Sequence, residues 1–145
     1  MGPSAGDLLD EVRKGGGVDD PVLRDRLARL HIEAELLRLI RLRTVTARIR
    51  GEQPGPEASI RKVLADEHGQ RIMELAKDLA GPYGVLEHQR AEGARYLFAQ
   101  ALTIGGGTGD VQRNIVAERV LGLPHDVDVE AGKTWSEARA VPSLR

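Results

Sequence analysis

The sequence predicts an all-α protein, most simply an antiparallel four-helix bundle. Apolar residues recur every three or four positions along four separate segments, as they do on one face of a helix. Short connections rich in glycine and proline divide these segments, which favours antiparallel neighbours. Hydrophobic residues make up 41% of the chain but aromatic residues only 3%, so leucine, alanine, valine and isoleucine must build the core.

Composition narrows the class of protein further. The 145 residues suffice for about one domain with a real core. The net charge of −1 gives no field that would attract nucleic acid or an anionic membrane. Cysteine is absent, which excludes disulfides, thiolate metal sites and a cysteine nucleophile. No apolar run approaches the roughly 20 residues of a membrane span. We therefore expect a cytoplasmic protein that does not bind nucleic acid and does not span a membrane.

The first long helix is predicted from about Asp20 to Arg50. Asp19 or Asp20 is a suitable N-cap, and Pro21 fits the first helical position. The helix is expected to stop at the stretch GEQPGPE. Its apolar face comprises Leu23, Leu27, Leu30, Ala34 and Leu37.

Three further helices are predicted. The second opens at Gly55-Pro56-Glu57 and ends at Gly81-Pro82. The third spans about Glu87 to Thr103, and the fourth begins after Thr108 and stops near Gly122. The stripe of the second helix comprises Ile60, Leu64, His68, Ile72, Leu75 and Leu79, and that of the fourth comprises Val111, Ile115, Val116 and Val120.

The bundle is expected to occupy residues 19–124. Residues 1–18 are interpreted as the remnant of a preceding helix and a linker, because GDLLDEVRK resembles the last turns of a helix whose beginning is absent. Residues 125–145 are expected to form a polar C-terminal tail that contains Trp135.

The stretch Gly105-Gly106-Gly107-Thr108 admits two interpretations. Glycines ahead of a helix can open backbone N–H groups toward an anion or a cofactor edge. They can equally form a tight corner between two helices, which the pattern alone favours. No Lys-Ser/Thr follows as in a phosphate-binding loop, and no strand precedes it as in a dinucleotide fingerprint. In either case Thr108 is predicted to cap the fourth helix.

Other polar residues point to structure rather than chemistry. The pattern favours a solvated helix face, with acids of a neighbour as possible partners, over a phosphate-binding strip for the arginines Arg38, Arg41, Arg43, Arg48 and Arg50, since no aromatic residues interleave them. The histidines His31, His68, His88 and His125 show no spacing typical of metal ligands. We expect His68 to be hydrogen-bonded between helices without a metal. The pairs Asp19-Asp20 and Asp66-Glu67 are interpreted as capping and solvation, and no nucleophile elbow is present.

Two stretches resemble the acyl-CoA dehydrogenase family. TIGGGTGDVQRNIVAERVLGLP is similar to the C-terminal signature of that family, whose last bundle helix begins after a Gly-Thr and continues with Gln-Arg. GPEASIRKVLADEHGQRIMELAKDLAGPYGVL resembles the preceding helix of the same domain, including its Gly-Pro-Tyr-Gly corner. The tail DVDVEAGKTWSEARA resembles the ends of bacterial members, so the resemblance covers nearly the whole chain.

The resemblance implies the C-terminal bundle of a flavoenzyme. Family members bind FAD, remove the α-proton of an acyl-CoA thioester and transfer the β-hydride to the flavin. They contain an N-terminal helical domain, a middle β-domain and this bundle, and they assemble as dimers or tetramers. The resemblance therefore implies FAD as cofactor, acyl-CoA as substrate and a homo-oligomer.

Individual residues carry over only where the motif matches. Thr108 and Asp110 match positions that approach FAD, and Gly81, Pro82 and Gly84 match a corner that meets the adenosine-diphosphate half of a neighbouring subunit's FAD. Some family members carry the catalytic Glu two residues before the threonine, where this chain has Gly106. The family's Arg-x-Thr-Phe-Gly is replaced by RKGGGVDDP. No catalytic base is therefore assigned.

Two functions follow as hypotheses. The first is the C-terminal domain of a FAD-dependent acyl-CoA dehydrogenase, inactive as these residues alone. The second is a free-standing, non-catalytic bundle that serves as an interaction or oligomerisation module. The mass of the native polypeptide distinguishes the two, since the family enzyme is several times larger than this chain.

Overall fold

The computed structural model describes residues 3–52, 55, 57–86, 92–125, 127 and 130–139. Within these residues the regular structure is entirely helical, which confirms the predicted all-α class. The predicted start of the second helix at Pro56 lies outside the described residues, as do the first residues of the predicted third helix (87–91) and with them His88.

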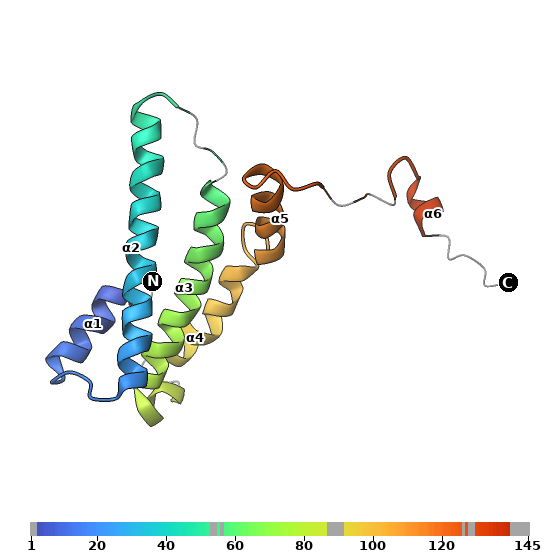
Figure 1. Cartoon of the computed structure of the whole chain (residues 1–145). Coiled ribbons are helices and arrows are strands. Elements are labelled where there is room, and N and C mark those ends of the chain that lie inside the picture. Colours follow the sequence, from blue (N-terminus) through green and yellow to red (C-terminus); the bar gives the residue numbers. More distant parts are fainter. Residues whose placement is uncertain are drawn as a thin grey trace.

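The described residues form two long helices together with shorter helices before and after them. α1 (Ala5–Lys14) leads into α2 (Pro21–Ile49), and α3 (Glu57–Leu79) returns antiparallel to α2 (Figure 1). The chain then turns through the 3₁₀ helix η1 (Gly81–Val85) and runs back along α3 as α4 (Glu92–Ala99), the 3₁₀ helix η2 (Gln100–Thr103) and α5 (Gly109–Arg119). The short α6 (Trp135–Ala138) lies away from the other helices (Figure 1).

Local sequence signals explain where the helices begin. The Asp20 carboxylate accepts a hydrogen bond from the backbone N–H of Val22 at 2.9 Å, which confirms the predicted cap of α2. α1 has a cap that the sequence analysis missed. Ser4 and Asp7 form a capping box, in which each side chain accepts a hydrogen bond from the other residue's backbone N–H.

The core lies where α1 crosses the first half of α2 and the second half of α3. It comprises Ala5, Leu8, Leu27, Leu30, Ile72, Leu75 and Ala76. Leu8 and Leu75 are each 1% exposed. Burying a leucine side chain contributes roughly 1.5–3 kcal/mol, so this cluster is the main source of stability in the bundle.

The last third of the chain differs from prediction in detail. The predicted third helix changes at Gln100 into the 3₁₀ helix η2, where the Thr103 hydroxyl donates to the Gln100 carbonyl oxygen at 3.1 Å. The tail predicted as merely polar contains α6, which begins with a capping box formed by Thr134 and Glu137. Trp135 in this helix is 75% exposed, and the Arg139 guanidinium lies 5.0 Å from its ring centroid.

No helix in the described part of the chain combines the length and the apolar character that crossing a bilayer requires.

Candidate cofactor-contact site

The glycine corner is a sharp turn between η2 and α5, as predicted. Gly106 and Gly107 have φ values of 70° and 96°, a conformation that favours glycine. Thr108 then caps α5, because its hydroxyl accepts from the N–H of Val111 at 3.4 Å. The predicted cap is confirmed, and the helix does not run through Gly106.

Polar side chains of α3 and α5 hold this corner in place. The Lys62 ammonium group donates to the carbonyl oxygen of Leu102 at 2.9 Å and pairs with the Asp66 carboxylate. The side-chain amide of Gln112 donates to the carbonyl oxygen of Gly106 at 3.0 Å. Backbone carbonyls that would lack a helical partner at this turn are thereby satisfied.

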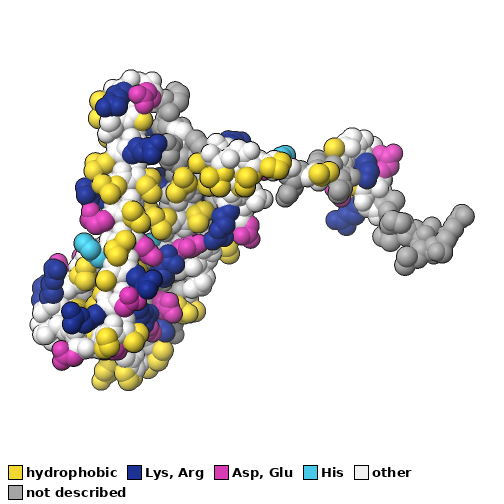
Figure 2. Space-filling view, in the orientation of Figure 1, with side chains coloured by type: hydrophobic (Ala, Val, Ile, Leu, Met, Phe, Trp, Pro, Cys, Tyr) yellow, Lys and Arg dark blue, Asp and Glu magenta, His cyan; other side chains and the backbone are white. Residues whose placement is uncertain are grey.

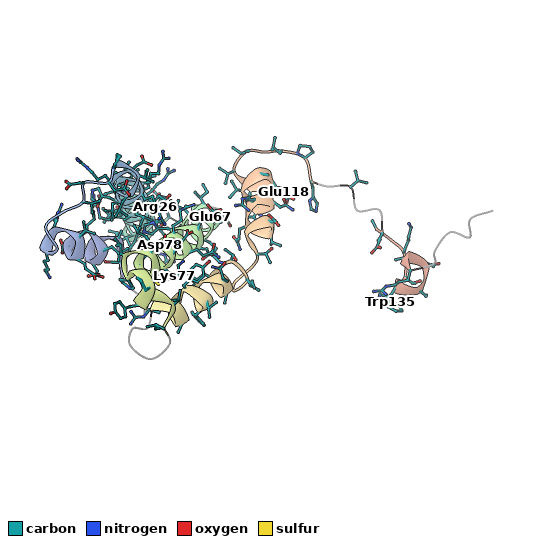
Figure 3. All side chains as sticks on the ribbon, turned by 90° about the horizontal axis from the view of Figure 1, so that it is seen from below. Arg26, Glu67, Lys77, Asp78, Glu118 and Trp135 are labelled. Carbon is teal, nitrogen blue, oxygen red and sulfur yellow. The ribbon has the colours of Figure 1, made fainter. Side chains whose placement is uncertain are left out.

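A chain of alternating charges connects the corner to the other helices. The Arg113 guanidinium pairs with Asp110 at 3.3 Å and with Glu67 on α3 (Glu67 is labelled in Figure 3). Arg71 lies 3.6 Å from the other oxygen of Glu67 and 3.1 Å from Glu33 on α2. These pairs align α5 with α3 and α2.

The corner borders a small open cavity of about 240 Å³. Thr103, Thr108 and Asp110 lie on one side of it, and Val63, Asp66 and Glu67 of α3 lie on the other. Pockets that enclose a drug-sized ligand measure about 300–1,000 Å³. The cavity at this corner is therefore smaller than one that encloses such a ligand.

No carboxylate at this corner is placed as a free base. Asp66 pairs with Lys62, Glu67 with Arg113 and Arg71, and Asp110 with Arg113. At position 106 the left-handed backbone conformation makes any side chain strained.

The second predicted contact segment, Gly81-Pro82-Tyr83-Gly84, forms η1 at the far end of α3. Gly84 is buried, and a Cβ atom there would lie 2.2 Å from the carbonyl oxygen of Lys77. The position therefore requires glycine for close packing on α3. Tyr83 in the same segment is 56% exposed.

A charged cluster on α2 and α3 lies beside this second segment. Asp78 pairs with Arg26 at 2.9 Å and with Lys77 at 3.0 Å, and the three side chains lie together in Figure 3. Partial burial acts to raise the pKa of Asp78, but the hydrogen bonds from Lys77 and Arg26 outweigh it and hold that pKa below its ordinary value. The hydrogen bond to Asp78 raises the pKa of Lys77, whose ammonium also lies 5.0 Å from the Tyr96 ring centroid.

The two predicted contact segments, one at the start of α5 and one in η1, lie apart from each other within one chain. Glu67 beside the first segment and Ala80 beside the second are separated by about 20 Å along α3, at 1.5 Å per residue. Thr108 and Asp110 therefore lie at a different place from Gly81, Pro82 and Gly84.

His68 lies where the sequence predicted it. It is 7% exposed, and its Nδ1 lies 2.9 Å from the Glu33 carboxylate across the α2–α3 contact.

The other polar residues named from the sequence lie as follows. In the arginine strip, Arg38 pairs with Glu35 at 2.8 Å, and all five members are exposed. The interpretation of that strip as a solvated helix face is confirmed. The pair Asp66-Glu67, interpreted as solvation, instead supports the corner.

Comparisons with known proteins agree on one family. The family model described as "Acyl-CoA dehydrogenase, C-terminal domain" matches residues 7–121. The acyl-CoA dehydrogenase IpdE1 of Mycolicibacterium smegmatis is 36% identical over 127 residues, which cover 83% of this chain and 30% of that protein. The chain thus spans less than a third of the length of this curated relative.

Solved structures show the same fold. The structure described as "Tcur3481-Tcur3483 steroid ACAD" superposes with a TM-score of 0.71 at 23% identity, covering 84% of this chain and 34% of that one. The ChsE4-ChsE5 complex from Mycobacterium tuberculosis superposes with a TM-score of 0.64 at 29% identity, covering 74% of this chain and 30% of that one. The helical arrangement is therefore that of the bundle in these proteins.

Proposed function

Because this chain belongs to the acyl-CoA dehydrogenase family, as a C-terminal helical domain, we propose that it supplies one wall of a FAD site. In this proposal Thr108 and Asp110 contact the flavin of one site, while Gly81, Pro82 and Gly84 contact the FAD held mainly by another subunit. The whole protein would oxidise an acyl-CoA thioester. The observation that carries the proposal is the capped start of α5 beside the exposed Asp110, at the position of the family signature.

The residues of the corner suit a flavin edge. The first N–H groups of α5 have no partner within the helix and can donate to carbonyl oxygens of a ligand. The Asp110 carboxylate, exposed at the end of its pair with Arg113, can accept from an N–H or O–H group of the ligand. A site with both kinds of partner can orient a polar ring whose edge carries donors and acceptors.

When bound, FAD would supply the redox chemistry of the reaction. This chain would bind and orient it and would help to exclude water. Since Gly106 offers no carboxylate and the carboxylates of the corner pair with cations, proton removal requires a base from outside these residues. The 145-residue chain alone is therefore expected to bind FAD weakly and to turn over no acyl-CoA.

We further propose that the chain works in an assembly, with its own copies or with a related chain. The two solved structures reported above are each described by a pair of protein names. In this proposal the two contact segments, which lie beside positions about 20 Å apart along α3, serve FAD sites of different subunits. The substrate class proposed is an acyl-CoA thioester, with either a fatty or a steroid acyl group.

A chimaera tests the proposal directly. Residues 7–121 of this chain would replace the matched region of the M. smegmatis relative, and bound flavin would be measured from its visible absorbance. The expected result is a folded protein with FAD, and turnover would be assayed with straight-chain and steroid-side-chain acyl-CoA substrates. Flavin without turnover still supports the proposed wall, since the base comes from elsewhere.

A folded chimaera that binds no FAD would contradict the proposed wall and favour the non-catalytic interaction module. The isolated chain gives the complementary test. Stoichiometric FAD together with acyl-CoA turnover in the isolated chain would show that no further wall and no further base are needed.

A further inference from the structure

The guanidinium group of Arg113 connects α3 to the start of α5. Its Nη2 atom pairs with Oε1 of Glu67 on α3, and its Nη1 atom lies 3.3 Å from Oδ1 of Asp110. The two terminal nitrogens of one planar group therefore engage two different carboxylates. Because the group is rigid, fixing it on one carboxylate also sets the place at which the other can bind.

Glu67 is the better-held of the two carboxylates. Its side chain is 35% exposed, compared with 93% for that of Asp110. Its Oε2 atom lies 3.6 Å from Arg71, which in turn lies 3.1 Å from Glu33 on α2. Figure 2 shows acidic and basic side chains next to one another across the middle of the bundle. Within the described part of the chain, Arg113 is the one cation paired with Asp110.

Gly109 leaves room for this guanidinium beside the backbone of α5. A Cβ atom at this position would lie 3.2 Å from Nη1 of Arg113. Gly109 is the first residue of α5, and its φ is not in the left-handed region, so the backbone conformation does not require glycine. The close approach of Arg113 is therefore the feature that a side chain at position 109 would disturb.

The place of Arg113 depends on its two partners rather than on the helix itself. The start of a helix carries a partial positive charge, which disfavours a cation beside it. Arg113 nevertheless reaches back to the first turn of α5, where Glu67 and Asp110 supply two negative charges. Loss of Glu67 would leave the guanidinium without its anchor on α3.

We propose that Arg113, anchored by Glu67, is a positioning residue for Asp110 at the flavin site. Its guanidinium holds the Asp110 side chain in one rotamer, so that the carboxylate meets the flavin edge already oriented and binding costs less conformational entropy. The inference rests on the proposed function, in which Asp110 contacts the flavin. It adds that the affinity for FAD depends on Arg113 through Asp110 and not through direct contact.

The orientation of Asp110 can be measured in the 145-residue chain without flavin. Coupling constants between its α- and β-protons report, by NMR, whether the side chain occupies one χ1 rotamer or averages over several. We expect one rotamer in the unaltered chain and averaging in Arg113→Gln and in Glu67→Gln. An Asp110 side chain that keeps one rotamer in Arg113→Gln would overturn the proposal.

Arg38→Gln is the matched control. Arg38 is 57% exposed, compared with 55% for Arg113, and it likewise pairs with a carboxylate three residues earlier in its own helix. Its pair lies on α2, away from the glycine corner. Arg38→Gln is therefore expected to change neither the rotamer of Asp110 nor the affinity for FAD.

The consequence for FAD is measured in the chimaera as a cycle of variants. Arg113→Gln is expected to raise the dissociation constant for FAD about fivefold. In a chimaera that already carries Asp110→Ala, the same substitution is expected to change that constant by less than about twofold, because no carboxylate is left to orient. A structural loss that is unrelated to Asp110 would persist in both backgrounds.

The outcomes separate this inference from the proposed wall. An effect of Arg113→Gln that is equally large in both backgrounds would overturn the inference, since Arg113 would then act without Asp110. Unchanged FAD affinity in Asp110→Ala alone would overturn the flavin contact proposed for that residue. The NMR measurement decides independently whether Arg113 orients the Asp110 side chain.

Discussion

The two halves of α3 are held by different kinds of interaction. In its C-terminal half, Ile72, Leu75 and Ala76 are buried against α1 and α2. In its N-terminal half, α3 meets the glycine corner and α5 through Lys62, Asp66 and Glu67, and no residue of α5 is buried. One region is an apolar core, and the other is a polar, partly open contact that carries the candidate flavin residues.

The difference separates stability from function within one small domain. Apolar burial contributes free energy in proportion to the area removed from water, whereas exposed ion pairs contribute about 0–1 kcal/mol each. The corner therefore fixes the direction of α5 without adding much to the free energy of unfolding. Substitutions in the two regions should differ in both magnitude and consequence.

The largest effect is expected for Leu75→Ala in the apolar region. Leu75 is 1% exposed, and truncation of such a residue costs about 2–5 kcal/mol because it leaves a cavity. Urea unfolding, followed by circular dichroism, measures this loss in the free energy of unfolding. Leu121→Ala is the matched control, since Leu121 is 65% exposed and its truncation should change stability by less than about 0.5 kcal/mol. Equal losses of stability in the two variants would mean that Leu75 does not belong to the core.

A smaller loss is expected for Gly84→Ala, in η1 beyond the C-terminal end of α3. The added Cβ would lie 2.2 Å from the carbonyl oxygen of Lys77, so η1 must move away from α3, at a cost of about 1–3 kcal/mol. Gly6→Ala in α1 serves as control, because its Cβ would meet only the Ser4 hydroxyl at 3.6 Å. Gly6→Ala should be neutral or stabilising. A Gly84→Ala variant as stable as the unaltered chain would show that η1 can move away from α3 without loss of stability.

A still smaller loss of stability is expected for Thr108→Ala in the polar region. Loss of the hydroxyl leaves the N–H of Val111 without its cap and should cost about 1 kcal/mol. Thr108→Ser retains the hydroxyl and should recover most of that loss, which the same unfolding measurement would show. If serine and alanine destabilise equally, the hydroxyl does not cap α5.

The smallest effect concerns the pH dependence of the Asp78 pairs. Because Lys77 and Arg26 hold the pKa of Asp78 below its ordinary value of 3.8, the carboxylate stabilises the fold above that value. The contribution is lost as the pH falls through the lowered pKa. The difference in unfolding free energy between the unaltered chain and Asp78→Asn should therefore shrink between about pH 5 and pH 3. A difference that stays constant over this range would contradict the assignment.

The sequence predicted the elements that depend on local signals. Pro21 after Asp20 marked the start of α2, Thr108 after three glycines marked the start of α5, and the stripe through Leu75 marked the buried face of α3. The change from α4 to η2 was not predictable in this way. It accompanies a contact of Gln70 on α3 with the carbonyl oxygen of Ala99 at 3.4 Å, between residues 29 apart in the sequence.

The candidate site could be predicted only in part. The resemblance identified Thr108, Asp110 and the Gly81–Gly84 corner, and it included Lys62, Gln112 and Arg113 within its motifs without giving them roles. Those roles arise from contacts between α3 and α5 that no local pattern encodes. Asp66-Glu67 resembled ordinary solvation in the sequence because its partners lie on other turns and helices.

The separation of the two regions is tested most directly by the FAD bound to the chimaera with Asp110→Ala, compared with Leu75→Ala. The account predicts that Asp110→Ala weakens FAD binding about tenfold or more, since it removes a charged acceptor, while the unfolding midpoint changes little. Leu75→Ala should lower the midpoint and leave FAD affinity unchanged at temperatures where the chimaera is folded. Unaltered FAD affinity in the Asp110→Ala chimaera, with its fold intact, would contradict the assignment of the polar corner to the flavin.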